Sequence, residues 1–202
     1  MKIILASSSP SRKKLLTSLN IPFKVVVSDV DESKLKKAIK DPKKLVCKLA
    51  LKKVDIVFKK LKNEKIENFL VIGADSIAAL LTKKGWIFLD KPKNKHQARN
   101  MALLLKNKAH KFYTGMVLKS SKGKQEKALV ATKVYFKDFS NKTLDDFIES
   151  EIWRGRAGGF DIEKNKSDLI AKWEGSYTNI LGLPMRKLIS LLKNFGVKIK
   201  KD

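Results

Sequence analysis

The stretch MKIILASSSPSRKKLL, residues 1–16, indicates the fold class of the chain. Its apolar run, residues 2–6, has the length and composition of a short buried strand. Ser9 and Pro10 follow as a helix cap and a proline at the first helical position, and leucines then recur at helical spacing. We therefore predict a strand that leads directly into a helix over residues 10–19. Hydroxyls and backbone N–H groups at such a helix start can bind an anion, although many Ser-Pro helix starts hold no ligand.

The remaining hydrophobic patterns alternate between strands and helices. They predict strands at 23–28, 69–74, 76–81, 86–89, 110–119, 125–137 and near 168–173, and helices at 42–62, 94–106, 143–151 and 184–194. This alternation predicts an α/β fold with a mixed sheet and flanking helices. Neither a repeat nor a Pro/Gly-rich linker divides the sequence, so we expect one domain over residues 1–202.

Composition excludes several classes of protein. Apolar residues make up 43% of the chain, which is enough for a packed interior. The longest apolar stretch is too short to cross a bilayer, and the start is too short for a secretory h-region, so we expect no membrane association. The single cysteine excludes an intrachain disulfide and fits a reducing cytoplasm. The two histidines, His96 and His110, lack metal-ligand spacing, and we expect them to be exposed or structural.

The formal charge of +25 suggests a polyanionic partner. The lysines are nevertheless spread from end to end, and aromatic residues do not interleave with them as they do on base-stacking surfaces. We therefore do not expect specific nucleic-acid binding. A small polyanionic substrate is compatible with this charge but is not required by it.

Polar residues follow several of the predicted strands, where open α/β sheets place their ligands. Arg12 follows the first strand and could give a bidentate contact to phosphate. Glu32 and Asp75 follow the second and third predicted strands. Two carboxylates beside a phosphate suit Mg²⁺, and one of them could instead orient or deprotonate a water molecule. An exposed loop carboxylate remains an equally good interpretation of Asp75 alone.

The order and spacing of the short motifs resemble one known family. The motifs are ASSSPSRKKLL, SDVDES, the end of LALKK, VIGADS, DKP, HKFYTG, RAGGF and EGSYTNILGLP. Together they resemble the Maf family of nucleotide pyrophosphatases, also called septum-formation inhibitors. The resemblance implies hydrolysis of a nucleoside triphosphate to the monophosphate and pyrophosphate, with Mg²⁺ or Mn²⁺ as cofactor. It also implies a mixed α/β fold with two lobes around a deep cleft, similar to inosine triphosphatases, and often a homodimer.

The resemblance assigns roles to individual residues. It places phosphate binding on Ser7, Ser9, Arg12, Lys53 and Lys91, the acidic motif on Glu32, and the proton acceptor on Asp75. We expect Glu32 and Asp75 to bind the divalent metal and to position a water molecule for attack on the α-phosphorus. Phosphoryl transfer needs positioning and charge neutralisation rather than a covalent nucleophile, so this set is sufficient.

Three positions associated with base choice depart from the common family pattern: Ser11, Ser76 and Glu163. Ser11 replaces an arginine, Ser76 replaces a threonine, and Glu163 stands where pyrimidine-specific members have glutamine. A glutamate accepts hydrogen bonds only and favours a base that offers N–H groups, such as guanine. Ser11, Glu163 and the FYTG segment (Phe112 to Gly115) therefore favour the branch resembling 7-methyl-GTP pyrophosphatases, whereas GADS and GSYTNILGLP are closer to the dTTP/UTP branch. The base stays open, with a slight preference for a modified or purine nucleotide.

A second hypothesis comes from the charge and from the older family name. It describes a nucleic-acid-binding regulator of cell division without hydrolytic activity. A third is an enzyme whose altered specificity residues accept an unusual nucleotide. Pyrophosphate release distinguishes the enzymes from the regulator, which would instead show tight, salt-sensitive binding to nucleic acid.

Overall fold

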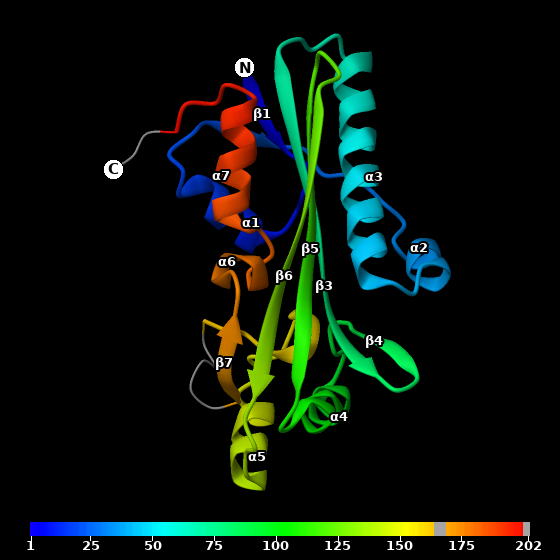
Figure 1. Cartoon of the computed structure of the whole chain (residues 1–202), viewed down its shortest axis with the longest axis vertical. Coiled ribbons are helices and arrows are strands. Elements are labelled where there is room, and N and C mark those ends of the chain that lie inside the picture. Colours follow the sequence, from blue (N-terminus) through cyan, green and yellow to red (C-terminus); the bar gives the residue numbers. More distant parts are fainter. Residues whose placement is uncertain (164–168, 200–202) are drawn as a thin grey trace. The chain divides into compact units, whose positions relative to one another are not determined.

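A computed structural model of the chain describes residues 1–163 and 169–199, and these residues form two compact units (Figure 1). Unit 1 comprises Met1–Ser76, Thr114–Val130 and the chain from Leu181 onward. Unit 2 comprises Ile77–Tyr113 and Ala131–Ile180. Three long strands contribute residues to both units. The single domain expected from the sequence stays a prediction.

Seven strands form a mixed sheet in the order β2-β1-β3-β5-β6-β7, and β4 also pairs with β3. The strands are β1 (Lys2–Leu5), β2 (Phe23–Val25), β3 (Phe69–Thr82), β4 (Gly85–Leu89), β5 (Ala109–Ser120), β6 (Gln125–Phe136) and β7 (Ile170–Glu174). Pairing of β1 with β2 and β3 is parallel, whereas β4 pairs with β3 and β7 with β6 in antiparallel fashion. This confirms the mixed α/β class. The expected cleft between two lobes stays a prediction.

Unit 1 places helices on both faces of its part of the sheet (Figure 1). Its helices are α1 (Pro10–Thr17), α2 (Ser33–Ala38), α3 (Pro42–Asn63) and α7 (Met185–Asn194). Side chains alternate along β1, so that Ile3 and Leu5 pack with α1 and α7 while Ile4 packs with α3. The two faces together form the core of the unit.

Helix α3 begins at a well-formed cap and lies very close to the sheet. Asp41 accepts hydrogen bonds from the backbone N–H groups of Lys43 and Lys44, at 2.7 and 3.2 Å, and Pro42 occupies the first helical position. A Cβ atom on Gly115 of β5 would lie 2.6 Å from the carbonyl oxygen of Val46. Only a glycine permits this approach of helix to strand.

Unit 2 contains three α-helices and one 3₁₀ turn within the described residues. They are α4 (Lys95–Leu105), α5 (Asn141–Glu149), η1 (Ala157–Gly159) and α6 (Tyr177–Ile180). Asn179 is fully buried and donates hydrogen bonds to the carbonyl of Phe112 and to the hydroxyl of Thr132. His110 is also buried, with its ring beside Phe136 and Phe160.

Most predicted elements are confirmed, but one boundary was wrong. Residues 69–74 and 76–81 form a single strand, β3, which continues through Asp75. The polar pair Asp75-Ser76 looked like a strand end because the sequence does not reveal a change of partner. Along β3 the pairing passes from β1, parallel and ending at Leu5 opposite Ile72, to β4, antiparallel and beginning opposite Ala78. The two polar residues occupy the interval between these partners.

Smaller differences concern short elements. The second strand is shorter than expected, Phe23–Val25 rather than 23–28, and α2 and α6 were not predicted. The strand expected near 168–173 is β7, and its predicted start at residue 168 lies outside the described residues. Among the described residues no helix is long and apolar enough to span a membrane.

Candidate active site

Arg12 lies in the first turn of α1, where the fold of the N-terminal stretch holds it. Ser9 caps the helix, and its hydroxyl accepts a hydrogen bond of 3.4 Å from the backbone N–H of Arg12. Ser7, in the turn before the helix, is buried and accepts hydrogen bonds from Arg12 Nη1 at 3.2 Å and from the backbone N–H of Ser9 at 3.3 Å. Ser7, Ser9 and Arg12, which the resemblance assigns to phosphate binding, thus lie together.

The guanidinium of Arg12 is fixed by two further partners within unit 1. Its Nε donates to the carbonyl of Gly182 at 2.8 Å, and its Nη2 donates to the hydroxyl of Ser76 at 3.0 Å. Ser76 in turn is 2.9 Å from the hydroxyl of buried Thr114. The planar guanidinium is therefore held in one orientation, and its fork geometry suits a phosphate.

Asp75 and Ser76 point to opposite faces of the sheet because side chains alternate along a strand. Ser76 faces α1 and meets Arg12, whereas Asp75 faces α3 and meets Lys53. The neighbouring strand β1 has already ended at this level, and β4 has not yet begun. Both faces of β3 can therefore supply groups to one site within unit 1.

On the α3 face a lysine lies between two carboxylates. Lys53 Nζ donates to Glu32 Oε1 at 2.8 Å and forms a second ion pair with Asp75 Oδ1. The side chains of Lys53 and Asp75 are 12% and 8% exposed, whereas Glu32 is 35% exposed and also lies 3.7 Å from Lys36. The acidic pair is consequently buried at Asp75 and open to solvent at Glu32.

The local charges act on the two carboxyls in opposite ways. Burial raises the pKa of Asp75, and the charges of Lys53 and Arg12 offset only part of this effect. Burial also opposes ionisation of Glu32, but the hydrogen bond and charge of Lys53 outweigh it, so the pKa of Glu32 is lowered. The environment thus favours proton uptake by Asp75 and the ionised form of Glu32.

Arg12 is affected by the same carboxylates from the other face of the strand. Burial lowers the pKa of Arg12 from its ordinary value, and the negative charges of Asp75 and Glu32 act against this. The guanidinium remains protonated at neutral pH, because arginine side chains stay ionised in proteins. Two cations and two anions therefore balance within the site.

The donor set fits Mg²⁺ or Mn²⁺ held jointly with a substrate. Glu32 and Asp75 both lie within hydrogen-bonding distance of one nitrogen, so their oxygens converge on a single point. Within residues 1–163 and 169–199, no cluster of three or more His, Cys, Asp or Glu side chains could hold a metal. Two carboxylates are what Mg²⁺ commonly takes from a protein when phosphates and water complete its shell.

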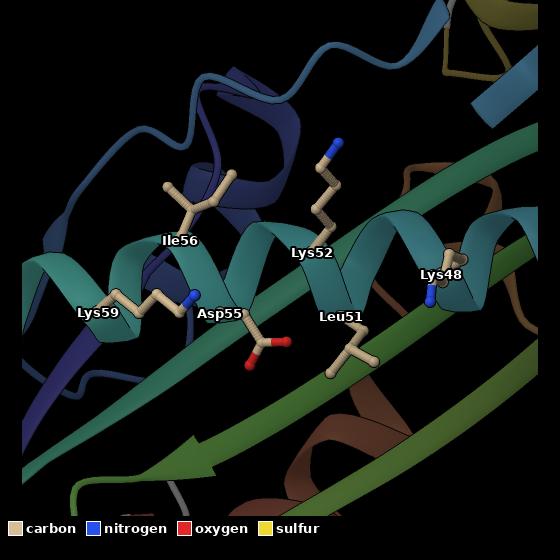
Figure 2. A pocket seen from close by; sticks show the side chains of 6 residues that line it. All are labelled: Lys48, Leu51, Lys52, Asp55, Ile56 and Lys59. Carbon is tan, nitrogen blue, oxygen red and sulfur yellow. The ribbon is translucent and has the colours of Figure 1, made fainter. Parts of the chain in front are cut away.

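Helix geometry separates Lys53 from its neighbour Lys52. Consecutive helical residues point roughly 100° apart, so Lys53 turns toward β3 while Lys52 is exposed. Figure 2 shows six side chains of α3 that line a pocket. The volume of this pocket is about 270 Å³. Its lining residues are Lys48, Leu51, Lys52, Asp55, Ile56 and Lys59, none of which is a predicted site residue.

Three predicted site residues lie outside the contacts described above. Lys91 is exposed in the loop between β4 and α4 and belongs to unit 2. Glu163 also belongs to unit 2, where it is exposed and its backbone N–H donates to Asp161 at 3.0 Å. Ser11 lies partly exposed in the first turn of α1, beside Arg12. The roles assigned to these three residues stay predictions.

Two residues of the site were missed as individuals. Thr114 and Gly182 complete the hydrogen bonds around Ser76 and Arg12, although both lie far from them in the sequence. Gly182 adopts a positive φ of 95°, which its place in the turn-like LGLP segment could have indicated. The buried hydroxyl of Thr114 leaves no comparable signal in a single sequence.

Comparisons with known proteins identify the family of the chain. The chain is 38% identical to a dTTP/UTP pyrophosphatase of Caldanaerobacter subterraneus, over 98% of this chain and 91% of that protein. It is 36% identical to a dTTP/UTP pyrophosphatase of Chelativorans sp., over 98% and 92%. A HAM1 protein from Coxiella burnetii shares the fold, with a TM-score of 0.54 and 13% identity over 96% and 99% of the two chains. Residues 2–195 match the family described as Maf-like protein, and the chain belongs to the Maf family.

Proposed function

We propose that this protein hydrolyses nucleoside triphosphates to the monophosphate and pyrophosphate, with dTTP and UTP as preferred substrates. Two full-length relatives carry the name dTTP/UTP pyrophosphatase at 36% and 38% identity. The observation that carries the proposal is the convergence of Glu32 and Asp75 on one point, beside the oriented guanidinium of Arg12. These are the charges that a triphosphate and its hydrolysis require.

Arg12 and the start of α1 bind the phosphates in this proposal. The guanidinium contributes charge and directed N–H groups, and the hydroxyls of Ser7 and Ser9, which accept hydrogen bonds here, can each donate their own O–H. Because Arg12 is already held by Ser7, Ser9, Ser76 and Gly182, its side chain needs no large reorientation when the substrate binds. Lys91 is a further proposed phosphate-binding residue.

The chemical step is an attack of water on the α-phosphorus. Asp75 accepts a proton from the attacking water, a role that its raised pKa favours. The new P–O bond forms to the water oxygen, and the bond from the α-phosphorus to the α–β bridging oxygen breaks. Pyrophosphate leaves with the bonding electrons, and the water oxygen remains on the nucleoside monophosphate.

Glu32 and Asp75 would hold the divalent cation. When bound, Mg²⁺ or Mn²⁺ supplies positive charge that neutralises the phosphate oxygens and the developing negative charge. Glu32 is well suited to this role, since its lowered pKa keeps it ionised over a wide pH range.

The names of the relatives and the specificity residues favour different bases. The names of the relatives favour dTTP and UTP. Glu163 favours a base with N–H donors, and Ser11 replaces a common arginine, so a 7-methyl-GTP-like substrate is the competing choice. Ser76 faces Arg12 and would influence the substrate from the phosphate side.

A nucleotide panel tests the proposal. Release of pyrophosphate is measured for dTTP, UTP, dCTP, dGTP, dITP and 7-methyl-GTP with Mg²⁺ and then Mn²⁺, using the native protein beside Glu163→Gln. We expect dTTP and UTP to be cleaved fastest by the native protein. A preference for 7-methyl-GTP that Glu163→Gln abolishes would establish the competing choice. Tight, salt-sensitive nucleic-acid binding without any hydrolysis would instead support the regulator.

We also propose that the protein forms a homodimer and is located in the cytoplasm. Sedimentation of the purified protein tests the first. Microscopy of a tagged chain in its own cells tests the second.

A further inference from the structure

The ammonium group of Lys53 occupies the position between Glu32 and Asp75. We infer that Lys53 serves as an internal counterion that keeps divalent ions out until a nucleotide arrives. The metal then enters with the nucleotide, and Lys53 transfers its contact to a phosphate oxygen. This inference rests on the proposed function, which supplies the nucleotide.

Charge balance is the first argument. The site holds two carboxylates, Glu32 and Asp75, and two cations, Lys53 and Arg12, with the ammonium in contact with both carboxylates. A divalent ion that entered alone would bring excess positive charge into a partly buried site, where such charge is weakly screened. A triphosphate carries enough negative charge to remove this obstacle. The free protein therefore has reason to bind divalent ions weakly.

Burial is the second argument. The Asp75 side chain is 8% exposed, and a buried carboxylate without a partner is strongly unfavourable. Lys53 prevents that state in the free protein, since its ammonium pairs with Asp75 as well as Glu32. A divalent cation can take over this function only when it binds the same oxygens.

The side chain itself is suited to moving. An ammonium is a compact charge on a flexible four-carbon stem and needs no fixed planar geometry. Lys53 is 12% exposed and Glu32 is 35% exposed, so the pair opens to solvent on the Glu32 side. Arg12, in contrast, is tied to three separate partners and stays in place.

The test measures Mn²⁺ binding without nucleotide, from the decrease of the free-ion electron paramagnetic resonance signal at pH 7.5. Native protein is compared with Lys53→Met and with Lys53→Gln, which retains a hydrogen-bond donor. Lys36→Met is the matched control, since Lys36 also lies close to Glu32, at 3.7 Å. It removes the same charge from the vicinity without vacating the position between the carboxylates.

We expect both Lys53 variants to bind Mn²⁺ at least about tenfold more tightly than the native protein, because a cation in direct contact with both metal ligands is removed. We expect Lys36→Met to stay within about threefold of the native value, because its exposed pair is screened. Equal affinities of native and Lys53 variants would overturn the inference. An equal gain in Lys36→Met would also overturn it, because the effect would then be one of overall charge.

Thermal unfolding provides a second measurement if the Lys53 variants are unstable. Mn²⁺ should raise their midpoint temperature while leaving that of the native protein nearly unchanged. Variants that neither bind Mn²⁺ nor gain stability from it would contradict the inference.

A separate arm distinguishes a failure of the proposed function. Native protein is titrated with Mn²⁺ in the presence of an α,β-methylene analogue of dUTP, which cannot be cleaved at the α–β position. Tight ternary binding is expected. Absence of nucleotide binding and of hydrolysis would refute the proposed function, even if the Lys53 variants gained Mn²⁺ affinity as expected.

Discussion

Acidification should destabilise unit 2 through His110. The side chain is 1% exposed, lies against Phe136 and Phe160, and has no hydrogen-bond partner for either ring nitrogen among the described residues. Burial lowers the pKa of His110 to about 3. A histidine in the unfolded chain has a pKa of about 6.5. Below this pH the unfolded chain therefore binds a proton at His110 that the folded chain does not bind.

The sign and size follow from this difference. The folded pKa lies below the unfolded one, so stability is lost as the pH falls from about 6.5 toward 3. At pH 5 the unfolded histidine is almost fully protonated while the folded one is neutral, and the loss amounts to about 2 kcal/mol. This value depends mainly on the unfolded pKa, since His110 stays neutral in the folded protein at pH 5.

The assay is urea unfolding of native protein and His110→Leu at pH values from 7.5 to 5. All three tryptophans, Trp86, Trp153 and Trp173, belong to unit 2, so their fluorescence reports the unit that contains His110. The contributions of other titrating groups cancel when the two proteins are compared. We expect the native protein to lose about 2 kcal/mol more than the variant between pH 7.5 and 5. Equal losses would refute the assignment of His110 as a buried neutral histidine.

Three further changes test the packing and the hydrogen bonds of the site. Thr114→Val removes the hydroxyl beside Ser76 and should lower kcat/KM by about 5- to 30-fold, which corresponds to the loss of one or two hydrogen bonds. Thr114→Ser keeps the hydroxyl and should retain activity. A Thr114→Val variant with native kinetics would exclude Thr114 as a positioning residue. The lysine of Arg12→Lys cannot reproduce the contacts to Gly182 and Ser76, so kcat/KM should fall about 100-fold or more. A loss of less than about tenfold would contradict the role of the planar guanidinium. Gly115→Ala places a Cβ atom 2.6 Å from a backbone oxygen of α3. It should lower the free energy of unfolding, measured by urea titration, by about 1–3 kcal/mol. Native stability of this variant would show that α3 can shift freely.

The elements that bury one apolar face were predictable from sequence. The stripe on α3 from Leu45 to Leu61 and the alternation along β1 specify which side chains enter the core, because burial of apolar area dominates their energetics. The start of α1 was equally clear, since Ser9 and Pro10 are read locally as a cap and a first helical residue.

The course of β3 was not predictable in the same way. A carboxylate within a strand looks like a strand end, since burying it is unfavourable without a partner. The partner of Asp75 is Lys53, on a helix, and the interval between β1 and β4 makes room for the polar pair. Both facts depend on tertiary structure.

Some residues of the candidate site could be predicted from the sequence, and others depend on tertiary structure. Arg12, Glu32 and Asp75 could be proposed from their positions after strands, whereas Lys53 is one of 45 Lys and Arg residues and has no local distinction. It is selected because its direction on α3 and the close approach of α3 to the sheet bring it to Asp75. Thr114 was outside the predicted set for the same reason, since its contact to Ser76 joins residues far apart in sequence.

The proton-accepting role of Asp75 is the central claim, and its most direct test is the turnover number of Asp75→Asn with dTTP and Mg²⁺, measured beside the native protein as pyrophosphate released. Asparagine has nearly the same shape but cannot accept the proton, so turnover should fall by about 10²- to 10⁴-fold while the circular dichroism spectrum stays native. A folded Asp75→Asn protein that releases pyrophosphate at the native rate would contradict the account.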